Sequence, residues 1–342
     1  MLRTAGKHAL RKELRKNLKK LSQDELNKQS HHVLFSLANL LDQLVAPSTK
    51  MKTKKKPAII AQDTPIGVAC YMNMDDSEIK TLNIIKYLFN KHTNDGDGDD
   101  DDDNGQNGSS RYKVYLPRCT STRETNQVNF RSLQDLKHQD HLTFHHMDSF
   151  ESVVDLKPVG KYKLREPQVD LAETSLNSNS DDRKTIITYK KSSDPTSVRI
   201  SDILENTETD NTKINEGNLH THVTHEKVND NITLYHPPPK DIQIIIVPGL
   251  GFNVEQMSRI GHGKGYYDDY IKRHIHYHKS SDGGSSEIEE RPVLIGVCLK
   301  EQILKEKLPL EDHDYLMDYI IDGSGEVYVN EATSEHIRTK RH

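Results

Sequence analysis

The residues best suited to chemistry lie in one short stretch, 259–268, which reads R-I-G-H-G-K-G-Y-Y-D. Its three alternating glycines let backbone N–H groups approach an anion closely, because no Cβ blocks the approach and positive φ is accessible. Arg259 and Lys264 supply the countercharge that a polyphosphate needs. The stretch therefore predicts a binding site for the phosphate groups of a nucleotide.

The stretch differs from an ordinary P-loop. The pattern G-x-x-x-x-G-K-[ST] is absent, and Lys264 is followed by Gly265 instead of the hydroxyl residue that would hold magnesium. Asp268 is the nearest carboxylate that could bind that ion. Three glycines alone would suit a tight turn equally well, and it is the basic, aromatic and acidic neighbours that favour a functional loop.

The elements around this loop can be predicted from the pattern of apolar residues. The run from Ile242 to Val247 is rich in β-branched residues and is typical of a strand buried on both faces. A helix predicted from Tyr266 adds its N-terminal dipole to the anion site. Strands and helices alternate along the chain, which predicts an α/β fold with a mostly parallel sheet in three layers. In such sheets ligands bind at the carboxyl ends of the strands, where this loop lies.

Further elements follow from the same patterns. Residues 5–44 predict two helices, the second opened by a capping box at Ser22. A helix is expected around Leu82–Leu88 and a strand at Val293–Leu299. Additional strands are expected at these positions: Ala58–Ala61, Ile66–Tyr71 and Tyr112–Leu116, the last ended by Pro117.

Composition favours a single domain over residues 1–342. Only 33% of the residues are hydrophobic and there is no Trp, so the apolar segments can form one core of roughly 200 residues. Polar stretches at 93–110, 169–240 and 276–291 are expected to be disordered insertions. The first contains a run of Asp residues that repel one another.

Charge and cysteine content exclude several classes of function. The formal net charge of −5 gives no general case for nucleic acid. Three widely spaced cysteines suit free thiols in a reducing compartment. No apolar run reaches the ~20 residues that a membrane span needs, so no membrane partner is expected. The cytoplasm is the expected location, with the mitochondrion as the alternative because the basic N-terminal helix resembles a leader.

The motifs resemble one known family. V-P-G-L-G-F at 247–252, followed by R-I-G-H-G-K-G-Y-Y-D, resembles the signature of the 5-formyltetrahydrofolate cyclo-ligases, also called methenyltetrahydrofolate synthetases. Segments resembling the family's nucleotide-contacting helix (Lys7–Arg11) and folate-contacting loop (Tyr71–Met74, then Glu78) precede it in the family's order. Two residues depart from the pattern: His262 stands where Arg or Gly is usual, and Asn253 replaces a common Asp.

The resemblance implies a Rossmann-like fold of the NagB/RpiA/CoA-transferase type and a monomeric ligase. It also implies that ATP drives the cyclisation of 5-formyltetrahydrofolate to 5,10-methenyltetrahydrofolate, with Mg²⁺ as cofactor. The resemblance also implies which residues bind ATP: Lys7, Arg11, Arg259, Gly261, His262, Gly263, Lys264, Gly265, Tyr266 and Tyr267. Two of these, Arg259 and Lys264, are expected to be catalytic. The folate-binding residues are Met72, Glu78, Tyr162 and Tyr266, and the magnesium ligands are Asp268 and Asp314.

Other interpretations remain open at this point. The chain could be an ATP-binding relative that acts on a different carboxamide or carboxylate. It could also be a non-catalytic RNA-binding derivative that uses its basic first helix and the run Lys50–Lys56. Without the resemblance, Lys7 and Arg11 would be ordinary members of a solvated helix face.

Overall fold

The computed structural model describes residues 4–45, 65–74, 77–91, 110–121, 140–159, 164–167, 238–281, 291–311 and 313–331. The expected insertions at 93–110 and 169–240 fall outside these ranges, except for Ser110 and residues 238–240. The basic run 50–56, the strand expected at Ala58–Ala61 and Tyr162 also lie outside the described residues. Within the third expected insertion, 276–291, the first six residues are helical, because helix α9 continues to Ser281.

The described residues form a seven-stranded sheet with the order β11-β10-β9-β6-β1-β2-β3. Five neighbouring strands are parallel, and the outermost strand on each side is antiparallel. The bounds in sheet order are Val327–Val329 (β11), Tyr319–Ile321 (β10), Val293–Val297 (β9), Ile242–Val247 (β6), Ile66–Ala69 (β1), Tyr112–Ser121 (β2) and Asp140–Met147 (β3).

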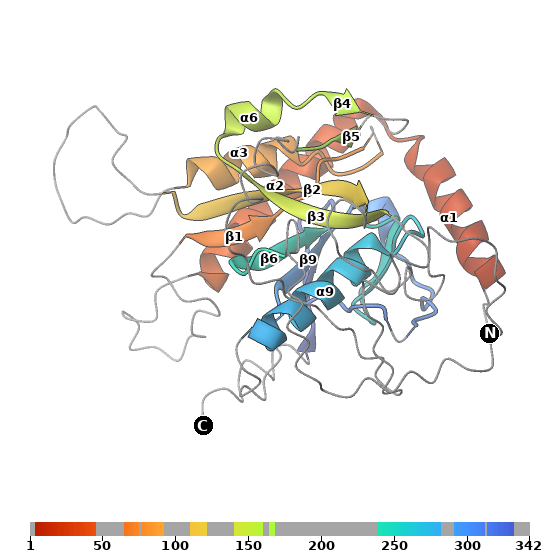
Figure 1. Ribbon diagram of the computed structural model, residues 1–342. Coiled ribbons are helices and arrows are strands. Elements are labelled where there is room, and N and C mark those ends of the chain that lie inside the picture. Colours follow the sequence, from red (N-terminus) through yellow and green to blue (C-terminus); the bar gives the residue numbers. More distant parts are fainter. Residues whose placement is uncertain are drawn as a thin grey trace, which may run out of the picture.

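Helices cover both faces of the sheet, which confirms the three-layer α/β prediction (Figure 1). Helix α2 (Gln23–Leu44) and helix α3 (Leu82–Asn90) pack on one face, and α9 (Tyr266–Ser281) packs on the other. Within β6, Ile244 and Ile246 belong to the core on the α2 and α3 side, and Ile245 and Val247 belong to the α9 side. Because side chains alternate across a strand, the apolar residues Ile244–Val247 of β6 are buried in both cores.

The two N-terminal helices form as predicted. Helix α1 spans Thr4–Leu18, and α2 follows after a short turn. The Ser22 side chain accepts a hydrogen bond of 3.2 Å from the backbone N–H of Glu25, which caps α2. A shorter helix, α6 (Phe150–Val154), follows β3 and adds Val153 to the core beside α3.

The prediction that Pro117 ends its strand is wrong. Strand β2 continues through Pro117 to Ser121 and pairs along that length with β3. Strand β1 ends opposite Tyr115, so from Pro117 onward one edge of β2 has no partner strand among the residues that the structure describes. Proline is tolerated at such an edge because its missing N–H leaves no ladder hydrogen bond unmade there.

The order of the parallel strands places a crevice at one point of the sheet. From β1 the chain passes to β2 on one side, and from β6 it passes to β9 on the other side. The two connections therefore leave β1 and β6 in opposite directions, which opens a crevice at their carboxyl ends. Helix α1 lies beyond these strand ends (Figure 1).

Candidate functional site

A cleft of about 1220 Å³ opens at the carboxyl ends of β1 and β6. Its walls come from α1, from the segments that follow these two strands, from the glycine loop 261–265, and from residues 308–314. A two-stranded sheet of β4 (Pro158–Val159) and β5 (Leu164–Arg165) forms part of its rim. The site-bearing segments predicted from the sequence therefore meet in one cavity, apart from Tyr162, which lies outside the described residues.

A hairpin presents the glycine loop to this cleft. Strand β7 (Gly251–Asn253) pairs antiparallel with β8 (Ser258–Ile260), and the loop follows directly. Gly263 has φ +103° and Gly265 has φ +62°, a region that only glycine adopts freely. The sequence predicted a turn and a helix here, and the hairpin between β6 and the loop was missed.

Asn253 fixes the base of the hairpin. Its side chain is buried, and its amide nitrogen donates to the carbonyl oxygens of Leu304 and Glu306, each at 3.1 Å. Its amide oxygen accepts a hydrogen bond of 2.8 Å from the backbone N–H of Gln256. An aspartate could accept but could not donate, so in this chain the amide performs a role that the usual Asp cannot.

Three basic side chains of helix α1 line the cleft. Lys7, Arg11 and Arg15 recur at intervals of four residues and all line the cavity. The Nε of Arg11 donates to the carbonyl oxygen of Gly261 at 2.9 Å, so α1 is joined directly to the glycine loop. The sequence pointed to Lys7 and Arg11 but not to Arg15, although the same spacing, continued one more turn, would have identified it.

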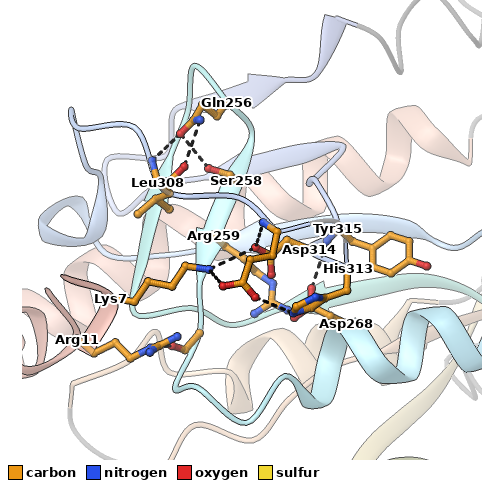
Figure 2. Close-up of polar contacts among 12 residues, drawn as sticks. Lys7, Arg11, Gln256, Ser258, Arg259, Asp268, Leu308, His313, Asp314 and Tyr315 are labelled. Atoms are coloured by element: carbon orange, nitrogen blue, oxygen red, sulfur yellow. Dashed lines mark hydrogen bonds and ion pairs between the residues drawn. The ribbon is translucent and has the colours of Figure 1, made fainter. Parts of the chain in front are cut away.

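Lys7 pairs with the opposite wall of the cleft. Its Nζ lies 2.8 Å from Glu311 Oε1 and 3.7 Å from Asp314 Oδ2 (Figure 2). The ammonium lowers the pKa of Glu311 below its ordinary value. Any anion that binds Lys7 would therefore compete with a carboxylate already in place.

Arg259 and Asp268 form an ion pair of 2.7 Å (Figure 2). The other oxygen of Asp268 accepts a hydrogen bond of 3.3 Å from the backbone N–H of Tyr315. Tyr267, whose pKa is raised by burial, lies under the Arg259 guanidinium at 5.6 Å and packs against both cores. In contrast, His262, Gly263 and Lys264 are exposed to the cleft.

The segment after β1 supplies the other side of the cavity. Met72 is buried beside it, and Glu78 is buried with its Oε2 accepting a 2.9 Å hydrogen bond from the backbone N–H of Met74. The second oxygen of Glu78 lies 3.5 Å from Nε2 of His262 in the glycine loop. Tyr266, the first residue of α9, lines the same space.

Glu166 is a cleft residue to which the sequence assigned no role. Its Oε1 accepts a 3.1 Å hydrogen bond from the backbone N–H of Cys119, and burial raises its pKa above the ordinary value. Its position depends on the pairing of β2 with β3, which brings Cys119 to the rim. Gln302 also lines the cleft, and its side-chain amide donates a 2.6 Å hydrogen bond to the carbonyl oxygen of Gly249.

The carboxylates suit a magnesium ion that arrives with a nucleotide better than an ion held by protein alone. In the part of the chain that the structure describes, no group of three or more His, Cys, Asp or Glu side chains could hold a metal. Asp268 and Asp314 both line the cavity. Mg²⁺ commonly binds one or two carboxylates together with substrate phosphates and water, and the donor set fits that pattern.

Comparison with known proteins gives a consistent result. The model of the 5-formyltetrahydrofolate cyclo-ligase family matches residues 180–323. A Saccharomyces cerevisiae protein named 5-formyltetrahydrofolate cyclo-ligase is 30% identical over 291 residues, which cover 85% of this chain and 92% of that protein. A Schizosaccharomyces pombe protein named probable 5-formyltetrahydrofolate cyclo-ligase is 38% identical over 82 residues, 24% of this chain and 37% of that protein.

Among solved structures, an NMR structure of 5,10-methenyltetrahydrofolate synthetase from Aquifex aeolicus aligns with this chain at 17% identity and a TM-score of 0.43. The alignment covers 96% of this chain and 93% of the Aquifex chain.

Among the described helices, none is long and apolar enough to cross a membrane.

Proposed function

This chain belongs to the 5-formyltetrahydrofolate cyclo-ligase family, and on that premise we propose that it is a ligase of folate metabolism. It converts ATP and 5-formyltetrahydrofolate into ADP, phosphate and 5,10-methenyltetrahydrofolate. The observation that carries this proposal is the joint position of the two predicted half-sites. The glycine loop with its α1 cations and the segment of Met72 and Glu78 line one cleft.

The reaction needs an activated formyl group. The N5 formyl group is an amide and a poor electrophile, so its oxygen first takes the γ-phosphoryl group of ATP. N10 then attacks the formyl carbon, the C–O bond breaks, and the oxygen leaves as part of phosphate while the N10 proton passes to solvent. Such phosphoryl transfer depends mainly on positioning and on charge stabilisation, which cations and backbone N–H groups provide.

The cations divide into two roles. Lys264, Lys7 and Arg11, with the backbone N–H groups of the glycine loop, hold the triphosphate, and Lys264 stabilises the charge that develops on the transferred group. Arg259 has a positioning role in this proposal, because its guanidinium is already paired with Asp268. This differs from the direct phosphate contact that the sequence resemblance implied.

The folate ring system binds on the other side. The pterin carries several N–H donors, and the buried carboxylate of Glu78 is an acceptor suited to them. Met72 and Tyr266 offer apolar and aromatic surface for the rings. The cleft surrounds the substrate on several sides, and excluding water from the activated formyl group would protect it from hydrolysis.

Mg²⁺ would be held by Asp314 together with the ATP phosphates. Asp268 is less suited, because both of its oxygens already accept from protein donors. When bound, the ion neutralises charge on the β- and γ-phosphates.

The test is direct. Purified protein is mixed with 5-formyltetrahydrofolate, ATP and Mg²⁺, and the near-ultraviolet absorbance of the methenyl product is followed. We expect an ATP-dependent rise that Lys264→Ala abolishes and that Lys16→Ala, an exposed lysine of α1 outside the cleft, leaves intact. If ATP binds but no product forms, the assignment of the folate substrate is wrong.

A cytoplasmic location and a monomeric state remain predictions. Cell fractionation and light scattering of the purified chain would test them, with recovery in mitochondria or a dimer mass as the contrary results.

A further inference from the structure

We propose that His262 is a positioning residue that links nucleotide binding on the glycine loop to folate binding at Glu78. This inference rests on the proposed function and concerns how the two substrates affect each other. Its basis is a chain of three side chains from three different walls of the cleft. Arg15 comes from α1, His262 from the glycine loop, and Glu78 from the segment after β1.

The geometry assigns a separate neighbour to each nitrogen of the imidazole. Nη2 of Arg15 lies 3.5 Å from Nδ1 of His262 and 3.4 Å from the backbone oxygen of the same residue. Nε2 lies 3.5 Å from Oε1 of Glu78. Since arginine can only donate and a carboxylate can only accept, the neutral ring with its proton on Nε2 satisfies both neighbours.

The Glu78 carboxylate has a different neighbour among the described residues at each of its two oxygens. Its side chain is 9% exposed, and its other oxygen is held by the backbone N–H of Met74. Among the described residues, the Met74 N–H is the donor to Oε2, and the other oxygen, Oε1, faces His262. The contact with His262 fixes the second oxygen and thereby the direction in which Glu78 presents its acceptors to the cleft.

The same histidine is part of the proposed phosphate-binding backbone. His262 lies between Gly261 and Gly263, and the loop is exposed at residues 262–264. Phosphates bound by the backbone N–H groups of this loop would add to the contacts that Arg11 and Arg15 already make with it. A nucleotide that orders this loop also orders the ring of His262, so the folate that follows meets an oriented Glu78 and loses less conformational entropy on binding.

This link predicts positive coupling between the substrates. The dissociation constant of 5-formyltetrahydrofolate is measured by calorimetry without nucleotide and with a saturating non-hydrolysable ATP analogue and Mg²⁺. We expect the analogue to tighten folate binding about fivefold or more, the usual lower range for coupled sites, and folate to tighten analogue binding by the same factor. His262→Ala should bring this factor close to one; because the factor is a ratio of two affinities, a change in the affinity for the analogue alone does not alter it.

Two further variants separate positioning from a general structural effect. His262→Gln keeps an N–H donor that can reach Glu78 and should restore most of the coupling. In a Glu78→Ala background, His262→Ala should cause no additional loss of coupling, because Glu78→Ala already removes the acceptor of this contact. The matched control is His146→Ala, which breaks a histidine–carboxylate pair of 3.3 Å with Asp148 outside the cleft and should leave the coupling unchanged.

The outcomes distinguish this inference from the proposed function. If the unaltered protein turns over its substrates but His262→Ala keeps the same coupling factor, the inference alone is wrong. A coupling factor of one in an active unaltered protein would also overturn the inference alone. Failure of the unaltered protein to bind the folate at all would overturn both.

Discussion

Arg259 and Asp268 pair at 2.7 Å across the glycine loop, with side chains only 7% and 13% exposed. Arg259 lies in β8, the strand that leads into the loop, and Asp268 lies in the first turn of α9, the helix that leaves it. The ion pair therefore joins the two ends of the loop. The resemblance assigned these two residues to phosphate and to magnesium, and in the structure their side chains pair with each other.

Asp268→Asn should destabilise the protein. The change removes one partner of a nearly buried ion pair and leaves the Arg259 guanidinium uncompensated, which costs about 3 kcal/mol. Chemical denaturation measures the free energy of unfolding. If stability is unchanged while the magnesium dependence of turnover is lost, Asp268 is a metal ligand and the positioning role is wrong.

Glu311→Gln should improve ATP binding. The carboxylate pairs with Lys7 at 2.8 Å, and Glu311 is half exposed, so the pair is worth no more than about 1 kcal/mol. Releasing Lys7 should therefore lower the KM for ATP by up to about fivefold, with little change in kcat. Steady-state kinetics test this, with Glu306→Gln, an exposed neighbour, as the control. A higher KM would mean that Glu311 belongs to the binding site itself.

Asn253→Asp should destabilise the hairpin although the side chains have the same shape. The carboxylate loses both donors and faces the carbonyl oxygens of Leu304 and Glu306, at a cost of about 3 kcal/mol. Thermal and chemical denaturation would show the loss. Asn17→Asp, at an exposed position of α1, should change stability little, and equal stability of the two variants would contradict this account.

Asp241 should contribute to acid sensitivity. Burial raises its pKa, but hydrogen bonds from Tyr115 at 2.7 Å and Lys113 at 3.0 Å outweigh burial and leave the pKa below its ordinary value. A lowered folded-state pKa stabilises the protein above the unfolded value of about 3.9, and that stability is lost as the pH falls through the folded-state pKa.

Asp241→Asn should therefore lower the free energy of unfolding at pH 7 by about 1 kcal/mol, and the difference from the unaltered protein should shrink toward pH 3. Denaturation curves at both pH values provide the measurement. Asp148→Asn, at a carboxylate that is 94% exposed, should follow the unaltered protein throughout. If the difference in the free energy of unfolding between Asp241→Asn and the unaltered protein grows as the pH falls, a lowered folded-state pKa of Asp241 is wrong.

The sequence by itself determined the elements whose signals are local. The apolar run of β6, the helical spacing of α1 and α2 and the cap at Ser22 were all predicted correctly, because burial on both faces, amphipathic period and capping depend on neighbouring residues. The glycine loop and its flanking charges were recognised for the same reason.

Only the tertiary structure decided which charged side chains pair with one another. Strand β3 and the continuation of β2 past Pro117 depend on pairing between segments far apart in the chain, which short sequence patterns do not contain. In the same way, the pairing of Arg259 with Asp268, of Lys7 with Glu311 and of His262 with Glu78 follows from packing. A sequence shows that a side chain can carry charge or donate a hydrogen bond, but its partner is determined by the fold.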